Sequence, residues 1–294
     1  MPSNNINKRL EKSINRISIK QGKEQYIKGQ VKYLTRHIKA ISKFTVEQYF
    51  NSFYPVLDYE FLQFNYGGSF DRHTCIKQRY DVDTYLVYRE KDSPWYPMIP
   101  NRITGSNLFE LVRNHLEMFR ADYKVDLKIL KEFPYTHAIP IRIDFKKQFI
   151  LLDCIPALLN NDNLMTPNGM DSIKLVNPNM EIELLKELND MHHGNATKLI
   201  LLLKYWNIYH NKPLKPYVIE RFVENIFTTR NINTWANAVK TFFSNSVHIL
   251  REGIHIPDYF DPRKSILEDY TYEEIQEFYD AIIKANNYVN DDNW

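Results

Sequence analysis

Two aspartates beside a β-type run have the type and spacing that metal chemistry needs. Asp81 and Asp83 stand directly before the run Thr84–Tyr88. Side chains two positions apart on a strand point to the same face, so these carboxylates would lie side by side. They repel each other unless a cation lies between them, and magnesium prefers oxygen ligands of this kind. Asp81 and Asp83 are therefore candidate metal ligands, with an exposed strand end and solvated acids as the alternative.

A third aspartate, Asp153, interrupts an apolar run from Phe149 to Leu158. Burying an unpaired carboxylate there is costly, so a basic partner or a metal ion must compensate. If this run joins the strand of Asp83 in one sheet, three carboxylates come together. We prefer Asp153 to Asp144, which lies closer to the expected hairpin turn at residues 146–148.

The carboxylates of Asp81, Asp83 and Asp153 suit phosphoryl transfer assisted by a pair of metal ions. In that chemistry one ion lowers the pKa of the attacking hydroxyl, and the other steadies the triphosphate and its leaving pyrophosphate. We expect Asp81 and Asp83 to hold both ions and Asp153 to complete the site of the catalytic ion. Magnesium (Mg²⁺) is the expected ion, with manganese (Mn²⁺) as the alternative.

A glycine pair precedes these aspartates. The chain has 8 glycines, and Gly67 and Gly68 stand together directly before Ser69. Such a turn lets backbone N–H groups approach a phosphate, and a helix that starts there adds partial positive charge. Gly68 and Ser69 are therefore the candidate triphosphate-binding residues, with an ordinary turn as the alternative.

The order of these motifs resembles the polymerase-β-like nucleotidyltransferase superfamily. The matching residues are Gly68-Ser69, Thr74, Asp81-Val82-Asp83 and Leu152–Ala157. They are similar to the branch that holds oligoadenylate synthase, cyclic GMP-AMP synthase and the bacterial CD-NTases of anti-phage signalling (cGAS/DncV-like nucleotidyltransferases). The resemblance implies an α+β fold. Its nucleotidyltransferase core, a mixed sheet with helices and a long N-terminal helix, would pack against a C-terminal helical domain.

Two later segments extend the resemblance. Lys198–Asn207 resembles the family helix whose lysine contacts the triphosphate, which assigns that role to Lys204; a surface lysine on a core helix is the alternative. Pro213–Tyr217 resembles a stretch that ends in Ser-Tyr, and Pro216 replaces the serine. Only stacking on a nucleobase carries over, to Tyr217. Without a Cys/His cluster of suitable spacing, we expect no zinc thumb that binds duplex DNA.

The predicted secondary structure changes along the chain, from mixed helices and strands in the first half to helices in the second. Basic and apolar residues alternate between residues 6 and 43 at spacing that predicts one or two long helices. The remaining predicted elements are strands at Thr84–Tyr88, Ile139–Phe145 and Phe149–Ile155, and helices at Leu108–Phe119, Glu181–Met191, Ala196–Tyr209, Tyr217–Phe227, Thr234–Leu250 and Tyr272–Ala285. Asn195 is the expected cap of the helix at Ala196. We expect a catalytic domain over residues 1–165 and a helical domain over residues 166–294 that closes the nucleotide cleft.

Composition narrows the partners. Hydrophobic residues make up 44% and charged residues 25%, an ordinary globular balance. A net charge of +2 indicates no long polyanionic partner, while small phosphorylated ligands such as nucleoside triphosphates fit it. The two cysteines form no CxxC pair, and no apolar run reaches the length of a membrane span. We therefore expect a cytoplasmic protein with no membrane partner.

Together these features predict an enzyme that condenses nucleoside triphosphates, ATP among them. The product would be a cyclic or short linear oligonucleotide messenger, released with pyrophosphate and used, as the resemblance implies, in anti-phage defence. The alternatives are a template-independent transferase that adds nucleotides to RNA or to a protein, and a nucleotide-binding relative without turnover. The sequence does not specify the base, the linkage or a regulatory protein partner.

Overall fold

The computed structural model describes most of the chain as two compact units. The described residues are 2–18, 23–29, 31–32, 36, 59–75, 82–90, 104–123, 126–132, 134–145, 148–211, 213–259 and 261–291. A helical unit comprises residues 1–19, 72–79 and 179–294, and a sheet unit comprises residues 20–71 and 80–178. Each unit is thus assembled from segments that are far apart in the sequence.

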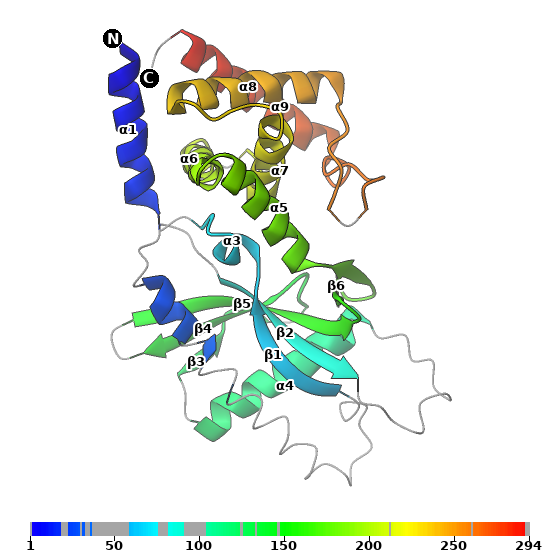
Figure 1. Cartoon of the computed structure of the whole chain (residues 1–294). Helices are drawn as coiled ribbons and strands as arrows, with labels where there is room; N and C mark the ends of the chain where they lie inside the picture. Colours follow the sequence, from blue (N-terminus) through cyan, green and yellow to red (C-terminus); the bar gives the residue numbers. More distant parts are fainter. Residues whose placement is uncertain are drawn as a thin grey trace. The chain divides into compact units, whose positions relative to one another are not determined.

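Within the described residues, the sheet unit contains a mixed sheet of 7 strands, most of which are labelled in Figure 1. Its strands follow the order β1-β2-β5-β4-β3, and β6 pairs with both β5 and β7. The elements are β1 (Tyr59–Tyr66), α3 (Gly68–Asp71), β2 (Val82–Glu90), α4 (Gly105–Tyr123), β3 (Leu127–Ile129), β4 (Ile139–Phe145), β5 (Gln148–Asn160), β6 (Asn163–Pro167) and β7 (Ile173–Val176).

Strand pairing in this sheet follows the predicted hairpin. β4 and β5 are antiparallel, with Phe145 opposite Gln148, so only two residues join the strands. β2 runs parallel to β5, whereas the other pairs within the described sheet are antiparallel. The three predicted strands are therefore confirmed, and two of them are longer than expected.

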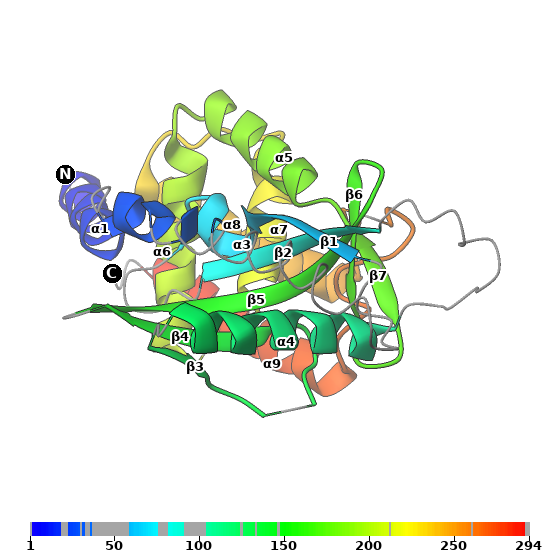
Figure 2. The same ribbon diagram turned by 90° about the horizontal axis from the view of Figure 1, so that it is seen from below.

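Helix α4 covers one face of the sheet with an apolar stripe (Figure 2). Leu108, Val112, Leu116 and Phe119 are fully buried and recur at the spacing of one helix face. They belong to the same core as the buried residues of β2, β4 and β5. The helix predicted at Leu108–Phe119 is confirmed within α4.

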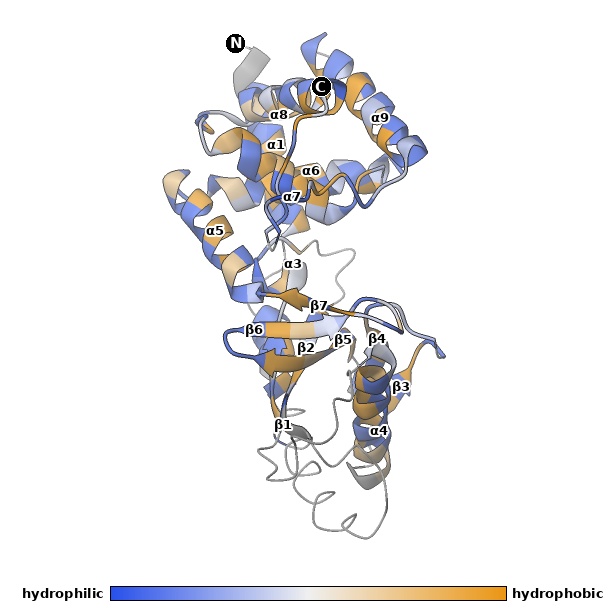
Figure 3. Cartoon of the chain, turned by 90° about the vertical axis from the view of Figure 1, so that its right-hand side faces the viewer, coloured by the Kyte–Doolittle hydropathy of each residue, from blue (hydrophilic) through white to orange (hydrophobic). Residues whose placement is uncertain are grey.

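The helical unit is built from six helices within the described residues. They are α1 (Pro2–Ile17), α5 (Pro178–Met191), α6 (Asn195–Tyr209), α7 (Pro216–Phe227), α8 (Trp235–Glu252) and α9 (Tyr272–Asn290). Orange apolar and blue polar residues alternate along α8 and α9 in Figure 3, as expected of helices with one buried face. The five predicted helices from Glu181 onward are confirmed.

Helix α1 packs within the helical unit. Ile14 is buried in the core that α6, α7, α8 and α9 share, and Ile17 is buried beside Leu201. The side chain of Asn7 also accepts a hydrogen bond from the backbone N–H of Ala236, at 3.0 Å. The N-terminal segment was expected from sequence to belong to the catalytic domain, but the apolar residues of α1 are buried among C-terminal helices.

The chain passes from the sheet unit to the helical unit at residues 178–179. The boundary expected from sequence, between residues 165 and 166, falls inside β6. That strand pairs with β5 on one side and β7 on the other, so the sheet continues to Val176. A short strand of this kind leaves little periodic signal, and its pairing depends on residues far along the chain.

The predicted cap of α6 is wrong. Gly194, at φ 80°, occupies the N-cap position, and glycine has no side chain that could accept a hydrogen bond from the first turn. Instead, Asn189 in α5 accepts a hydrogen bond from the backbone N–H of Thr197 at 3.1 Å. The left-handed turn moves Asn195 into the first turn of the helix, so the capping group comes from the preceding helix.

Among the described residues, no helix has the length and apolar character needed to cross a bilayer.

Candidate functional site

Asp83 and Asp153 face each other across a parallel strand pair. Asp83 on β2 is the direct register partner of Asp153 on β5. Neighbouring strands lie about 4.8 Å apart, and residues in register point to the same face of the sheet. The two carboxylates therefore lie side by side, as expected from the requirement that both strands join one sheet.

The alternation of burial shows which face carries the carboxylates. Val82 and Thr84, on either side of Asp83, are fully buried. Asp83 itself is only partly buried, and Asp153 alternates with buried neighbours in the same way. The two aspartates thus share the less buried face of these two strands.

The glycine turn lies directly against the strand of Asp83. The N–H of Gly67 donates to the backbone carbonyl of Asp83 at 3.0 Å. A side chain at Gly67 would overlap the ring of Tyr85, and one at Gly68 would overlap the carboxylate of Asp83. Gly68 also has φ +56°, a conformation that favours glycine. The pair is therefore needed to bring the turn, with Ser69 in the first turn of α3, beside Asp83.

This close packing changes what the glycine pair indicates. Contact with β2 alone explains why side chains are not tolerated at Gly67 and Gly68. The glycines are thus weak evidence for a phosphate by themselves. They do, however, place the N-terminal end of α3 next to Asp83, which was predicted as a metal ligand from a separate motif.

The carboxylate pair is chemically suited to a hard divalent cation, which takes oxygen ligands. Asp81, the remaining member of the predicted set, lies outside the described residues. Among the described residues no group of three His, Cys, Asp or Glu side chains could hold a metal ion. Two of the three predicted ligands, Asp83 and Asp153, thus lie within the described residues, and the metal-binding role of all three stays a prediction.

Asp144 is engaged elsewhere, in agreement with its rejection as a ligand. Arg142, two residues earlier on β4, donates from Nη2 to Asp144 Oδ1 at 2.7 Å and from Nε at 2.9 Å. Arg142 holds the pKa of the Asp144 carboxyl below its usual range, chiefly through this hydrogen bonding. In register, Asp144 lies opposite Phe149 and Asp153 opposite Pro140, so the two acids sit at different points along the β4–β5 pair.

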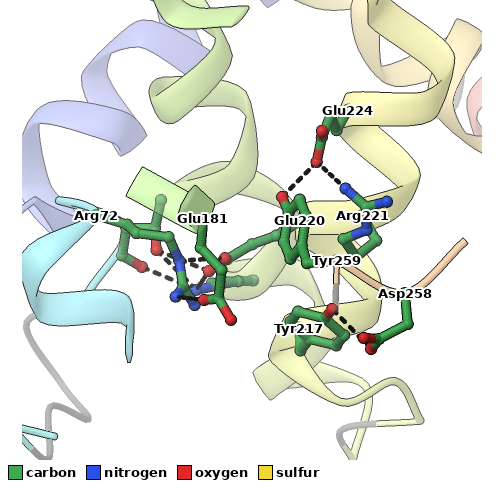
Figure 4. A network of polar contacts seen from close by, with 10 residues as sticks. Arg72, Glu181, Tyr217, Glu220, Arg221, Glu224, Asp258 and Tyr259 are labelled. Atoms are coloured by element: carbon green, nitrogen blue, oxygen red, sulfur yellow. Dashed lines mark hydrogen bonds and ion pairs between the residues drawn. The ribbon is translucent and has the colours of Figure 1, made fainter. Parts of the chain in front are cut away.

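A separate polar network lies inside the helical unit (Figure 4). Glu220 on α7 accepts hydrogen bonds from Arg72 Nε at 2.7 Å and from Thr74 Oγ1 at 2.8 Å. It also forms an ion pair with Lys204 of α6, whose Nζ donates to the carbonyl and hydroxyl oxygens of Thr74 at 3.2 and 3.0 Å. Arg72 pairs with Glu181 of α5 as well. We call Arg72, Thr74, Glu181, Lys204 and Glu220 the buried ion network.

Lys204 is therefore a core residue with an ionic partner. Its exposure is 4%, and that of Glu220 is 5%. The predicted contact between Lys204 and a triphosphate stays a prediction. The sequence-based alternative of a surface lysine does not describe it, because the ammonium group is enclosed with Glu220 and Thr74.

The two acids of the network have opposite pKa shifts. Burial by itself raises the pKa of Glu220, but Lys204 and Arg72 outweigh it and hold the pKa at about 2. Burial raises the pKa of Glu181 to about 7, because Arg72 offsets it only in part and Glu220 adds repulsion. Glu220 is thus the ionised centre of the network, and Glu181 titrates near neutral pH.

Tyr217, the predicted base-stacking residue, lies at the start of α7 in a second polar cluster. Its hydroxyl donates to Asp258 Oδ2 at 3.3 Å, and its ring meets the ring of Tyr259 edge-on, with centroids 6.0 Å apart. Tyr259 also hydrogen-bonds Glu224, which pairs with Arg221 (Figure 4). The contacts with Asp258 and Tyr259 orient the ring of Tyr217. The stacking of Tyr217 on a base stays a prediction.

Sequence reasoning missed the buried ion network, although one signal was present. Glu220 and Arg221, like Glu224 and Asn225 one turn later, stand among apolar residues between Val218 and Phe227. The argument that singled out Asp153, that a charged residue inside an apolar run needs a partner, applies equally to Glu220. Its partners could not be named, because they come from residues 72–74 and from α6.

Comparison of the sequence with known proteins finds a curated relative. A probable cyclic nucleotide synthase of Bacillus cereus (strain VD146) is 24% identical over 216 residues, which are 67% of this chain and 64% of that protein. The chain thus matches less than two thirds of the length of this curated relative. No protein-family profile matches the chain.

Solved structures show the fold. CdnC of Escherichia coli MS115-1 with ATP has a TM-score of 0.70 at 14% identity, with 97% of this chain and 90% of that chain covered. The CdnE cyclic dinucleotide synthase of Elizabethkingia meningoseptica, with GTP and Apcpp, has a TM-score of 0.56 at 15% identity, with 86% and 91% covered. The expected fold class, a mixed sheet with helices and further C-terminal helices, is confirmed.

Proposed function

Because the chain has the fold of the cGAS/DncV-like nucleotidyltransferases, we propose that it condenses nucleoside triphosphates into a cyclic or short linear oligonucleotide and releases pyrophosphate. The observation that carries the proposal is the register of Asp83 and Asp153, with Gly68 packed against the Asp83 carboxylate. ATP is proposed as one substrate, in line with the ATP named for CdnC. A signalling role in anti-phage defence is part of the proposal and rests on the family resemblance alone.

The chain's own residues support this chemistry through position and charge. Two carboxylates in register on neighbouring strands provide oxygen ligands close together on one face of the sheet, which suits a divalent cation. Asp81, Asp83 and Asp153 would hold magnesium, or manganese, in this proposal. When bound, such ions lower the pKa of an attacking hydroxyl and offset charge on the triphosphate and the leaving pyrophosphate.

The glycine turn supplies the complementary part. Gly68 keeps the backbone close to Asp83, and Ser69 follows in α3. Backbone N–H groups and a serine hydroxyl at a turn of this kind can donate to phosphate oxygens. We propose that Gly68 and Ser69 orient the triphosphate beside the carboxylates. Lys204 and Tyr217 are retained as further proposed nucleotide contacts.

The proposal is tested with radiolabelled nucleoside triphosphates. The protein is incubated with ATP, alone and with each other nucleotide, in magnesium or manganese, and the products are separated by chromatography. A phosphatase-resistant product together with pyrophosphate is expected. Pyrophosphate release with label only on added RNA or on protein would identify a transferase that uses an acceptor, and no release at all would overturn the proposal.

A further inference from the structure

The buried ion network holds the chain segment that directly follows the glycine turn. Arg72 is the third residue after Ser69, and Thr74 is the seventh residue before Asp81. Glu220 accepts a hydrogen bond from Arg72 Nε on Oε2 and another from Thr74 Oγ1 on Oε1. Lys204 Nζ donates to the backbone carbonyl of Thr74. The segment is thus fixed at its backbone and at two side chains within three residues.

Stability alone is a poor explanation for this arrangement. Taking charges out of water costs several kcal/mol per ion, and well-packed apolar residues of similar volume often give equal or greater stability. Here Thr74 is fully buried, and Glu220 and Lys204 are at least nine-tenths buried. Ion pairs and hydrogen bonds fix the direction of each group, whereas apolar packing does not.

We propose that Glu220 is a positioning residue for nucleotidyl transfer. By holding Arg72 and Thr74 it fixes residues 72–74, which come directly after α3 and the triphosphate-binding turn at Gly68-Ser69. Glu220 acts through these two residues and makes no contact with the nucleotide. The inference rests on the proposed function, and it gives Lys204 a positioning role through Glu220 and Thr74.

The chain offers a matched control on the same helix. Glu224 lies one turn after Glu220, is ion-paired with Arg221 and accepts a hydrogen bond from Tyr259. Its partners lie in α7 and in the segment around Pro257, and none of them belongs to residues 72–74. Glu220→Gln and Glu224→Gln thus each remove one ion-paired carboxylate from α7, but only the first releases the segment.

Hydrogen exchange gives a readout that does not depend on turnover. Loss of the charge at Glu220 weakens the hold on residues 72–74, so E220Q is expected to speed exchange of peptides covering residues 70–75 by about tenfold or more. E224Q should leave those peptides within about twofold of the wild type. Unchanged exchange in E220Q, or equal exchange in both variants, overturns the proposal.

Kinetics test the link to chemistry. E220Q is expected to lower kcat by about 10- to 100-fold, as misplacement of catalytic groups does, while KM for ATP changes less than about threefold. E224Q should lower kcat by less than about threefold. Equal losses in the two variants would show a general effect of lost stability and overturn the positioning role.

A milder variant covers the case in which E220Q does not fold. Thr74→Val keeps the shape of the side chain and removes the hydroxyl that lies between Lys204 and Glu220. It should speed exchange of the same peptides and lower kcat, and wild-type behaviour in both measurements overturns the proposal. If the wild type makes no product, the proposed function fails, and exchange still decides whether Glu220 holds the segment.

Discussion

Asp83 on β2 is the parallel register partner of Asp153 on β5, so two carboxylates from strands far apart in sequence lie side by side. Like charges placed directly opposite each other destabilise a sheet. An arrangement of this kind is retained where a cation or a charged substrate needs it. The relationship therefore predicts opposite effects on stability and on activity when one carboxylate is neutralised.

We expect Asp83→Asn and Asp153→Asn each to lower oligonucleotide formation by about 100-fold or more, because an amide binds a divalent ion far less well than a carboxylate. Without added metal, each variant should be as stable as the wild type or more stable by about 0.2–1 kcal/mol. Chromatography of labelled products and urea unfolding in chelator measure the two effects. Asp144→Asn is the control, and it should keep full product formation.

A pair of glycines allows the role of Gly68 to be separated from backbone strain. Gly68 and Gly169 both have positive φ, +56° and +78°, but only a side chain at Gly68 would overlap the carboxylate of Asp83. An alanine at either position is expected to cost about 1–2 kcal/mol of stability in urea unfolding. Only Gly68→Ala should also lower kcat, by about tenfold or more, because Asp83 must rotate away. Equal activity of both variants would contradict the proposed site.

Local sequence patterns predicted the elements of this fold well. Spacing of apolar residues located α4, β4 and the C-terminal helices, because each pattern reflects one buried face. The hairpin between β4 and β5 followed from two adjacent runs and a short polar turn. That β2 and β5 share one sheet was expected only because three carboxylates needed it, and the parallel direction of this pair was not predicted. The sequence between the two strands does not specify which strands are neighbours.

The features that the sequence did not predict depend on distant residues. Glu220 is one of four polar residues among the apolar residues of α7, and its partners Arg72 and Lys204 are 148 and 16 positions away. The packing of α1 with C-terminal helices depends on Ile14 and Ile17 finding a core that forms much later in the chain. Such contacts are set by the three-dimensional arrangement and leave no local periodicity.

The raised pKa of Glu181 predicts how stability depends on pH. Its pKa is about 7 in the folded protein, against 4.5 for an unperturbed glutamate, chiefly because of burial. Between about pH 4.5 and 7 the folded state therefore holds more protons than the unfolded state, and the free energy of unfolding falls as pH rises. The loss is on the order of 1–3 kcal/mol across this window.

Urea unfolding at pH 5 and pH 8 measures this contribution. Glu181→Gln cannot ionise, so the wild type should lose more stability than this variant between the two pH values. Glu183→Gln, at an exposed position of the same helix, is the control and should follow the wild type. The same pH dependence in all three proteins would show that Glu181 does not titrate in this range.

Two asparagines near the start of α6 test the correction to its cap. Asn189 accepts from the backbone N–H of Thr197 across the turn at Gly194, whereas Asn195 occupies the first turn of the helix. Asn189→Ala removes the only acceptor recorded for that N–H in the described structure and should cost about 1 kcal/mol in urea unfolding. Asn195→Ala should change stability by a few tenths of a kcal/mol or less, because Asn195 does not cap the helix and alanine is a better helix former than asparagine. A larger loss for Asn195→Ala than for Asn189→Ala would restore the cap that the local sequence suggests.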